Sequence, residues 1–280
     1  MLLLDKPVGP TAHDAVAIVR RALQVRRAGH TGTLDPFASG LLVVLVGRAT
    51  RLARYLVDLT KSYTGTIKLG ESTDTCDLTG EIVGGTDGWK EISSDRIADA
   101  MLAMTGTVSQ VPPSYSAKKI GGERAYRLAR RGELVELEPR EVQVQRFEML
   151  EREGAFVDFA SEVSSGTYIR GLARDLGEIL GCGAHLTALR RKSVGRFTVD
   201  DATLLDAVDA ATELRPPLEA VSHLPIVKID EELRNAVRCG RPIESSLDTG
   251  ESVALVAGDT LVAVAQSEAE LLKPRVVLEG

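Results

Sequence analysis

Cysteine is scarce in this chain, which has only Cys76, Cys182 and Cys239 among its 280 residues. An odd number of widely separated cysteines, none spaced as metal ligands, argues against a disulfide scaffold and against structural zinc. The four histidines, at positions 13, 30, 185 and 223, include no pair on one helical face. We therefore expect no metal, no cofactor and a cytoplasmic protein in a reducing compartment.

Long apolar runs are also absent. No stretch approaches ~20 consecutive apolar residues, so we expect no membrane span. The first residues lack a basic lead, an apolar stretch and a small-residue cleavage site, so we expect no secretion. Hydrophobic residues make up 44% of the chain and charged residues 26%, which is typical of a globular protein with a real core. The length suits one large domain and one small one.

Negative charge prevails overall, with a net charge of −6, but it is unevenly divided. Residues 200–280 hold 7 Lys or Arg and 16 Asp or Glu, a net of −9, whereas residues 1–199 hold 27 and 24, a net of +3. Three basic clusters lie in the first part: Arg20, Arg21, Arg26 and Arg27; the stretch 118–131; and Arg190, Arg191, Lys192 and Arg196. One such cluster is usually a solvated helix face, but three together favour a nucleic-acid partner.

The stretch 29–40 reads Gly-His-Thr-Gly-Thr-Leu-Asp-Pro-Phe-Ala-Ser-Gly and leads directly into an apolar run, 41–46. Pro36 biases Asp35 toward an extended backbone, and the glycines allow sharp bends or close approach to a ligand. A carboxylate on a stiff turn beside a buried strand is a candidate nucleophile or general base. The alternative is a plain turn in which Asp35 bonds its own backbone, and this loop taken alone favours the turn.

Several elements follow from hydrophobic period and capping residues. We expect helices that begin near Thr11 (with Asp14 completing a capping box), at Ser94 and after Arg170. The last of these should bury Leu172, Leu176 and Ile179. Strands are expected at 62–69, 142–147 and 156–163, with a hairpin at 252–257 and 260–265 and a helix at 230–238.

The stretch 110–132 combines basic residues, tyrosines and a Gly-Gly pair. This combination is typical of a segment that orders as it closes on a polyanion. Its basic residues are Lys118, Lys119, Arg124, Arg127, Arg130 and Arg131.

The stretch 29–40 resembles the signature of the TruB family, the bacterial tRNA pseudouridine-55 synthases. Further segments resemble that family in the same order: LLLDKP at 2–7, the K-x-Y and LGxxTDTxD strings within 61–77, QVPPxYSAxKxxGxRxYxxAR from 110, SxGTYIRxLxxDLG from 164, and GxGAHxxxLRR at 181–191. The resemblance covers roughly residues 2–199. Val43, where the family often has proline, is a departure without an explanation.

The family's fold class is α/β in the α+β sense. The resemblance implies a pseudouridine synthase fold, with a mixed, largely antiparallel sheet flanked by helices and a small PUA-like β-rich domain at the C-terminus. We expect a catalytic domain over 1–214, with an RNA-clamping insert at about 110–132. A linker over 215–225 and the PUA-like domain over 226–280 follow.

The resemblance also implies roles at the site. Asp35 is the nucleophile, Tyr63 lies against the uracil ring, and Tyr168 and Leu189 form pocket walls. His30 takes the place of the flipped uridine in the RNA stack. Without the resemblance, His30 is a loop histidine bonded to a carbonyl and Tyr63 is a core residue.

Arg170 is the candidate partner of Asp35, because a guanidinium keeps a carboxylate ionised when a bound base desolvates it. The alternative, a surface arginine at a helix start, is disfavoured by the helix dipole. Asp77 belongs to an acidic turn and is expected to line the pocket.

The predicted function is isomerisation of uridine 55 in the T-arm of tRNA, by a monomer that needs no obligatory protein partner. The six basic residues of 110–132 are expected to contact the RNA backbone. Two alternatives stay open: a non-catalytic RNA-binding or tRNA-folding protein, and an RNA-guided relative that works in a ribonucleoprotein.

Overall fold

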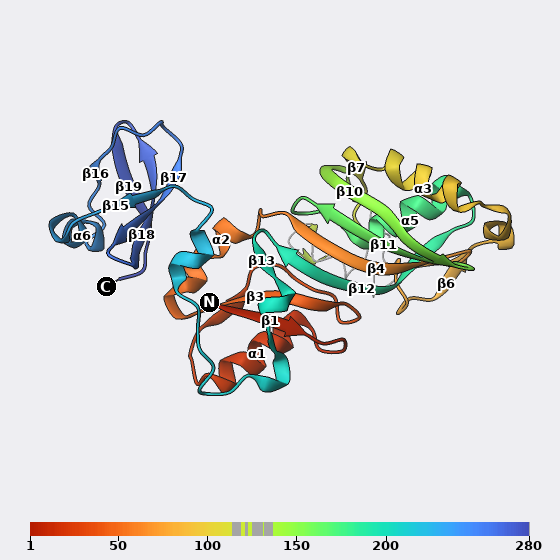
Figure 1. Cartoon of the computed structure of the whole chain (residues 1–280), viewed down its shortest axis with the longest axis horizontal. Coiled ribbons are helices and arrows are strands. Elements are labelled where there is room, and N and C mark those ends of the chain that lie inside the picture. The colour runs from red at the N-terminus through yellow and green to blue at the C-terminus, as the bar shows by residue number, and fades with distance from the viewer. Residues whose placement is uncertain (114–118, 121–122, 125–130, 132–136, 280) are drawn as a thin grey trace.

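A ten-stranded sheet forms the centre of the molecule in the computed structural model, which describes residues 1–113, 119–120, 123–124, 131 and 137–279 (Figure 1). Its strands are β1 (Leu2–Lys6), β2 (Ala28–His30), β3 (Ser39–Val46), β4 (Lys61–Leu69), β7 (Gly106–Gln110), β10 (Arg140–Glu153), β11 (Phe156–Val163), β12 (Ala184–Val194), β13 (Phe197–Thr198) and β14 (Thr203–Leu204). The order is β14-β1-β3-β12-β4-β11-β10-β7, with β2 beside β3 and β13 beside β12.

Most neighbouring strands in this sheet are antiparallel. Only the β1–β14 and β3–β12 pairs are parallel. The mixed, largely antiparallel sheet expected from the sequence is therefore confirmed. The β3–β12 pair joins the two halves of the sheet and involves only Ser39 with Arg190 and Gly40 with Arg191.

Three helices cover one face of the sheet: α1 (Ala12–Ala22), α3 (Ser94–Ala103) and α5 (Ile169–Leu180). They share one apolar core with β1, β3, β4, β10 and β11. The capping box is confirmed, because the Thr11 hydroxyl accepts from the Asp14 N–H while the Asp14 carboxylate accepts from the Thr11 N–H.

Two details of the predicted helices are wrong. Ser93 rather than Ser94 caps α3, since its hydroxyl accepts from the Arg96 N–H. Ile179 is 52% exposed, whereas Leu172 and Leu176 are fully buried. Leu172 and Leu176 are one turn apart and face the sheet, and the face of α5 that carries Ile179 lies in solvent.

The opposite face of β1 and β3 is covered by other segments. These are 3-10 helices at Gly47–Leu52 and Pro217–Val221, together with α2 (Ala53–Leu56), which contacts both of them. The segment 215–225, which we predict to be a linker, thus includes a short helix whose Ala220 and Val221 are fully buried.

A five-stranded sheet lies at one end of the long axis, away from α3 and α5 (Figure 1). Its strands are β15 (Ile226–Lys228), β16 (Ile243–Glu244), β17 (Ser252–Ala257), β18 (Thr260–Glu268) and β19 (Leu271–Val277), and α6 (Glu231–Arg238) packs beside them. The expected hairpin turns at Gly258, with a φ of +59°, and the helix expected over 230–238 is α6, which Asp230 caps. This confirms the small β-rich unit.

Two short hairpins complete the described elements: β5 (Ser72–Thr73) with β6 (Ile82–Gly84), and β8 (Lys119–Ile120) with β9 (Glu123–Arg124). Further 3-10 helices lie at Asp87–Glu91, Val199–Asp201 and Leu205–Ala207. Within the described ranges, no helix has the length and apolar character needed to cross a membrane.

Candidate active site

A cavity of about 440 Å³ opens on the helical face of the sheet, where the 29–40 loop meets β4, β12 and the segment before α5. Six of the seven catalytic and substrate-binding residues predicted from the sequence line it together: His30, Asp35, Tyr63, Tyr168, Arg170 and Leu189. These residues come from four separate stretches of the chain. The fold therefore brings into one cavity side chains that lie up to 159 positions apart in the sequence.

The loop that carries Asp35 is held from several sides. Its start pairs with β3 through β2, and the Gly9 N–H donates to the Pro36 carbonyl at 2.8 Å. The Arg191 guanidinium donates to the carbonyls of Leu41 (2.7 Å) and Gly32 (3.1 Å). A guanidinium suits this task because its donors diverge in a fixed plane. The carboxylate thus sits on a braced turn.

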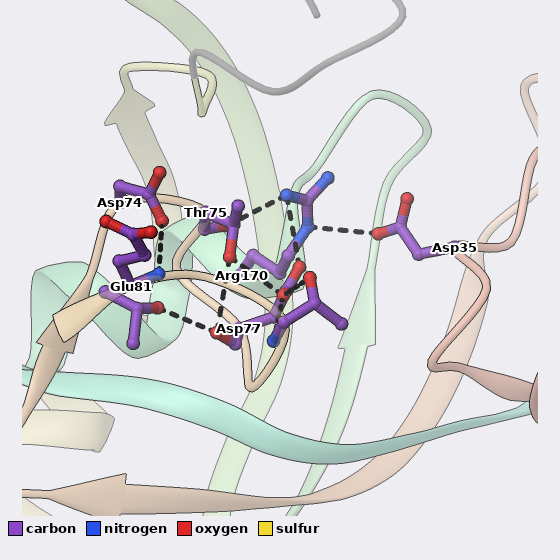
Figure 2. A network of polar contacts seen from close by, with 8 residues as sticks. Asp35, Asp74, Thr75, Asp77, Glu81 and Arg170 are labelled. Carbon is purple, nitrogen blue, oxygen red and sulfur yellow. Dashed lines mark hydrogen bonds and ion pairs between the residues drawn. The ribbon is translucent and has the colours of Figure 1, made fainter. Parts of the chain in front are cut away.

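Asp35 and Arg170 form the central contact of the cavity. Arg170 Nε lies 3.0 Å from Asp35 Oδ2, with side-chain exposures of 7% and 35% respectively. The same guanidinium donates through Nη1 to the Thr75 carbonyl at 2.9 Å and lies 3.4 Å from Asp77 Oδ2. Figure 2 shows Arg170 between the two carboxylates. The Thr75 carbonyl and Asp77 fix the arginine on its buried side, so that its Nε faces Asp35.

Asp77 does not line the cavity, contrary to the prediction, and reaches the site only through Arg170. It is 4% exposed, and its Oδ1 accepts from the Thr75 hydroxyl (2.8 Å), the Thr79 hydroxyl (2.5 Å) and the Thr79 N–H (2.9 Å). These bonds leave Oδ2 for the arginine. The sequence shows a T-x-D-x-T string here, but only the fold reveals that both threonines bond the same oxygen.

His30 lies in a partly buried place beside His13 of α1, with ring centroids 5.2 Å apart in an edge-to-face arrangement. Its Nδ1 is buried and has no hydrogen-bond partner among the residues that the structure describes. The alternative of a histidine bonded through Nδ1 to a carbonyl is therefore not observed. Burial, with His13 and Arg191 nearby, lowers the pKa of His30 to about 4, so the ring is neutral at physiological pH.

Besides Arg170, three buried cations surround the site, namely Lys6, Lys61 and Arg191, each at most 7% exposed, and neither lysine is among the site residues predicted from the sequence. Lys6 Nζ donates to the carbonyls of Pro7 (2.7 Å) and Pro10 (3.0 Å), and Lys61 Nζ to those of Val57 and Leu59. Burial lowers the pKa of each lysine to about 8. The signal in the sequence that could have identified Lys6 and Lys61 was a lysine placed within an expected strand of apolar residues.

Two of the four residues of the third basic cluster, Arg190 and Arg191, are held by partners within the protein. Arg191 is buried, and Arg190 makes a bidentate ion pair with Asp5, at 2.7 Å and 3.0 Å. Both guanidinium groups are used within the protein. The spacing of arginines along a strand did not show that Arg190 and Arg191, on opposite faces, each have an internal partner.

The predicted RNA-backbone residues fall only in part within the described structure. Lys118, Arg127 and Arg130 lie outside the described residues, and Lys119 and Arg124 are backbone partners in the β8–β9 hairpin. Arg131 is exposed in a turn. Within the described ranges, no group of three or more His, Cys, Asp or Glu side chains is placed to hold a metal ion.

Comparison with known proteins supplies the family. Residues 20–169 match the model of the TruB family pseudouridylate synthase (N terminal domain), and residues 170–247 match that of the tRNA pseudouridylate synthase B C-terminal domain. The tRNA pseudouridine synthase B of Thermobifida fusca (strain YX) is 45% identical, with 100% of this chain and 98% of that protein covered.

Two solved structures extend the likeness to the whole fold. One chain of a Cbf5-Nop10-Gar1 complex is 29% identical, with a TM-score of 0.76 over 99% of this chain and 84% of that one. A chain of an H/ACA RNP bound to a substrate RNA containing 2'-deoxyuridine is 26% identical, with a TM-score of 0.74 over 100% and 84%. With family models matching from residue 20 to residue 247, the chain belongs to the TruB family of pseudouridylate synthases.

Proposed function

We propose that this protein is a tRNA pseudouridine synthase that converts uridine 55 in the T-arm of tRNA into pseudouridine. The observation that carries the proposal is the Asp35–Arg170 ion pair inside the cavity, with Tyr63, Tyr168 and Leu189 in its walls. Membership of the TruB family and the 45% identity to the tRNA pseudouridine synthase B of Thermobifida fusca support the choice of substrate.

The reaction breaks the N1–C1′ bond of uridine, turns the freed base and joins C5 to C1′, after which the C5 proton leaves. Every atom of the nucleotide is conserved apart from that exchangeable proton, so no oxidant or reductant is needed. Asp35 acts as the nucleophile, at C6 of the base or at C1′ of the sugar. The cavity walls retain the uracil between bond cleavage and bond formation.

Arg170 keeps Asp35 ready for attack. A base lying over the carboxylate displaces water from it, and the guanidinium at 3.0 Å provides a charged hydrogen-bond donor in place of that water. Asp77 and the Thr75 carbonyl hold the arginine in place from behind. Tyr63 offers its ring to the base, and neutral His30 is suited to enter the RNA stack because a neutral ring costs less to desolvate.

The basic residues of the 110–132 segment, with Arg20, Arg21, Arg26 and Arg27 outside it, are proposed to contact RNA phosphates. Flipping a base costs a few kcal/mol, and phosphate contacts of this kind offset that cost. We further propose that the protein acts in the cytoplasm as a monomer without an obligatory protein partner. The domain limits 1–214, 215–225 and 226–280 belong to the same proposal.

The deciding experiment is release of tritium from [5-³H]uridine in a T-arm stem-loop by the purified chain alone. Tritium should appear, and removing the single target uridine should abolish it. A chain that works only when guided by RNA in a ribonucleoprotein would leave the bare stem-loop unmodified. Absence of tritium from every tRNA tested would refute the function.

Asp35→Asn separates an enzyme from a non-catalytic RNA-binding protein. We expect the rate to fall at least ~10³-fold, because the nucleophile is lost, while the Kd for the stem-loop stays close to that of the parent. Asp99→Asn is the matched control, since Asp99 is exposed on α3. Unchanged modification by Asp35→Asn would remove Asp35 from the mechanism.

A further inference from the structure

Gln110 is a buried polar residue for which the mechanism above has no use. It is the last residue of β7, the edge strand of the large sheet, and its side chain is 1% exposed. Burying an amide is costly unless its donors and acceptors find partners. It is also the first residue of the basic 110–132 stretch.

Both partners of the Gln110 amide are main-chain groups of one residue, Tyr168. The Tyr168 N–H donates to Gln110 Oε1 at 2.9 Å, and Gln110 Nε2 donates to the Tyr168 carbonyl at 3.0 Å. An N–H group requires the amide oxygen and a carbonyl requires the amide nitrogen, so only one orientation of the amide serves both. The pair fixes the peptide units on either side of Tyr168.

The contact lies at the start of α5, whose first turn needs a group from outside the helix to hold it. Tyr168 is the N-cap residue of α5, and its own side chain makes no capping hydrogen bond. The uncapped first turn of a helix moves easily unless an outside group holds it. Gln110 supplies that group from a strand 58 positions earlier in the chain.

Two further features indicate that α5 is built to receive this strand. A Cβ at Gly171 would lie 2.8 Å from Gln110 Nε2, so only glycine lets the amide come this close. The Arg174 guanidinium donates to the Val111 carbonyl at 2.9 Å. The end of β7 is thus fastened to the first two turns of α5 by Gln110 and by Val111.

We propose that Gln110 is a positioning residue for the isomerisation, because it sets the place of Tyr168 and Arg170 in the cavity. Tyr168 lines the cavity, and Arg170, two residues on, presents Nε to Asp35. Displacement of a reacting group by about 1 Å can cost on the order of 10²-fold in rate. Asp77 and Thr75 still hold the guanidinium, so loss of Gln110 has a smaller effect than loss of Arg170. The inference rests on the proposed function.

The test is Gln110→Met, which keeps the length of the side chain and removes both hydrogen bonds. Single-turnover tritium release from the T-arm stem-loop should slow about tenfold, while the Kd for the same RNA stays within about twofold. Gln143→Met is the matched control: Gln143 lies on the neighbouring strand β10, and its exposed amide meets only the Thr107 hydroxyl. The control should keep the parent rate.

Gly171→Ala disturbs the Gln110–Tyr168 contact from α5, and it tests the proposal if Gln110→Met does not fold. It should displace the amide and slow the single-turnover step in the same way. If this contact only stabilised the fold, both variants would have a lower melting temperature but would keep the parent rate and the parent Kd at 25 °C. Parent-like rates in the folded variants would overturn the positioning role, whereas an inactive parent protein would overturn the proposed function instead.

Discussion

The two sheets bury very different residues. The large sheet and its helices bury Lys6, Lys61, Asp77, Arg170 and Arg191, whereas the only buried polar side chain among the described residues of 200–280 is Ser267. The C-terminal part keeps its charges on the surface, although its net charge is the more extreme. Buried charge costs free energy even when it is paired. The protein therefore carries this cost at the site, where the chemistry needs fixed charges, and avoids it elsewhere.

The two regions are nevertheless joined by a common apolar core. Leu41, Val43 and Leu45 of β3 pack in the same cluster as Val256 and Leu261 of the C-terminal sheet. The Arg48 and Arg51 guanidinium groups donate to the carbonyls of 278 and 277 across this junction. Since β3 follows the Asp35 loop directly, the C-terminal sheet supports the strand next to that loop. Its contribution should be to stability rather than to the chemical step.

Among changes to the buried charges of the large sheet, Arg170→Lys should have the largest effect. A lysine has one ammonium and cannot reach the Asp35, Asp77 and Thr75 oxygens together. We expect single-turnover tritium release to fall on the order of 10²-fold, with little change in the Kd for RNA. Asp77→Asn should produce a smaller loss in the same direction, since it frees the guanidinium from one side.

Arg174→Lys is a suitable control for that change. Arg174 lies one turn further along α5, and Arg174→Lys alters a partly exposed ion pair with Asp175 and the bond to the Val111 carbonyl but no residue that lines the cavity. Its rate should exceed that of Arg170→Lys by a wide margin. Equal losses in the two variants would indicate that any arginine of this helix matters, and would break the contrast between fixed site charges and other charges.

A second test addresses the apolar side. Leu261→Ala, at a position only 4% exposed in the shared core, should lower the free energy of unfolding by about 2–4 kcal/mol. Denaturant titration measures the loss, and the rate of the folded variant should remain close to that of the parent. Leu233→Ala on α6, where the side chain is 38% exposed, should cost much less. A large rate loss in folded Leu261→Ala would show that the C-terminal sheet takes part in the chemistry.

The smallest effect concerns His30 and acid. Burial lowers the pKa of His30 from 6.5 to about 4, so between these values the unfolded chain binds the extra proton and the folded protein does not. Stability therefore decreases as the pH falls from about 6.5 toward 4. After allowance for partial exposure, His30 should account for about 1–2 kcal/mol of the loss between pH 7 and pH 5. His30→Gln, which cannot titrate, should show a shallower decrease in denaturant titrations.

Much of the architecture could be predicted from the sequence because local signals agreed with the fold. The capping box at Thr11, the alternation of β4 and the Gly258-Asp259 hairpin each depend on residues close together in the chain. The motif resemblance supplied the sheet type and the set of residues that meet in the cavity. Its assignment of catalytic and binding roles to those residues remains a prediction.

Other features could not be predicted because they depend on tertiary packing. Nothing near Arg191 in the sequence shows that its guanidinium lies under the carbonyls of Gly32 and Leu41, about 150 positions away. Asp77 has the composition of an ordinary acidic turn, and only the fold directs its second oxygen to Arg170. The Gln110 amide likewise finds its partner in a distant segment, at the start of α5. Polar groups buried by distant segments leave no periodic pattern.

Gly40 illustrates how narrow the join between the two halves of the sheet is. It has a φ of +102°, and a Cβ there would lie 2.3 Å from the Arg191 carbonyl oxygen and 2.7 Å from its nitrogen. Both neighbours are backbone and cannot rotate away. In a saturation library, this codon should tolerate no replacement, whereas Gly29, with open space around it, should accept alanine. The join between the two halves of the sheet thus depends on the absence of a single methyl group at Gly40.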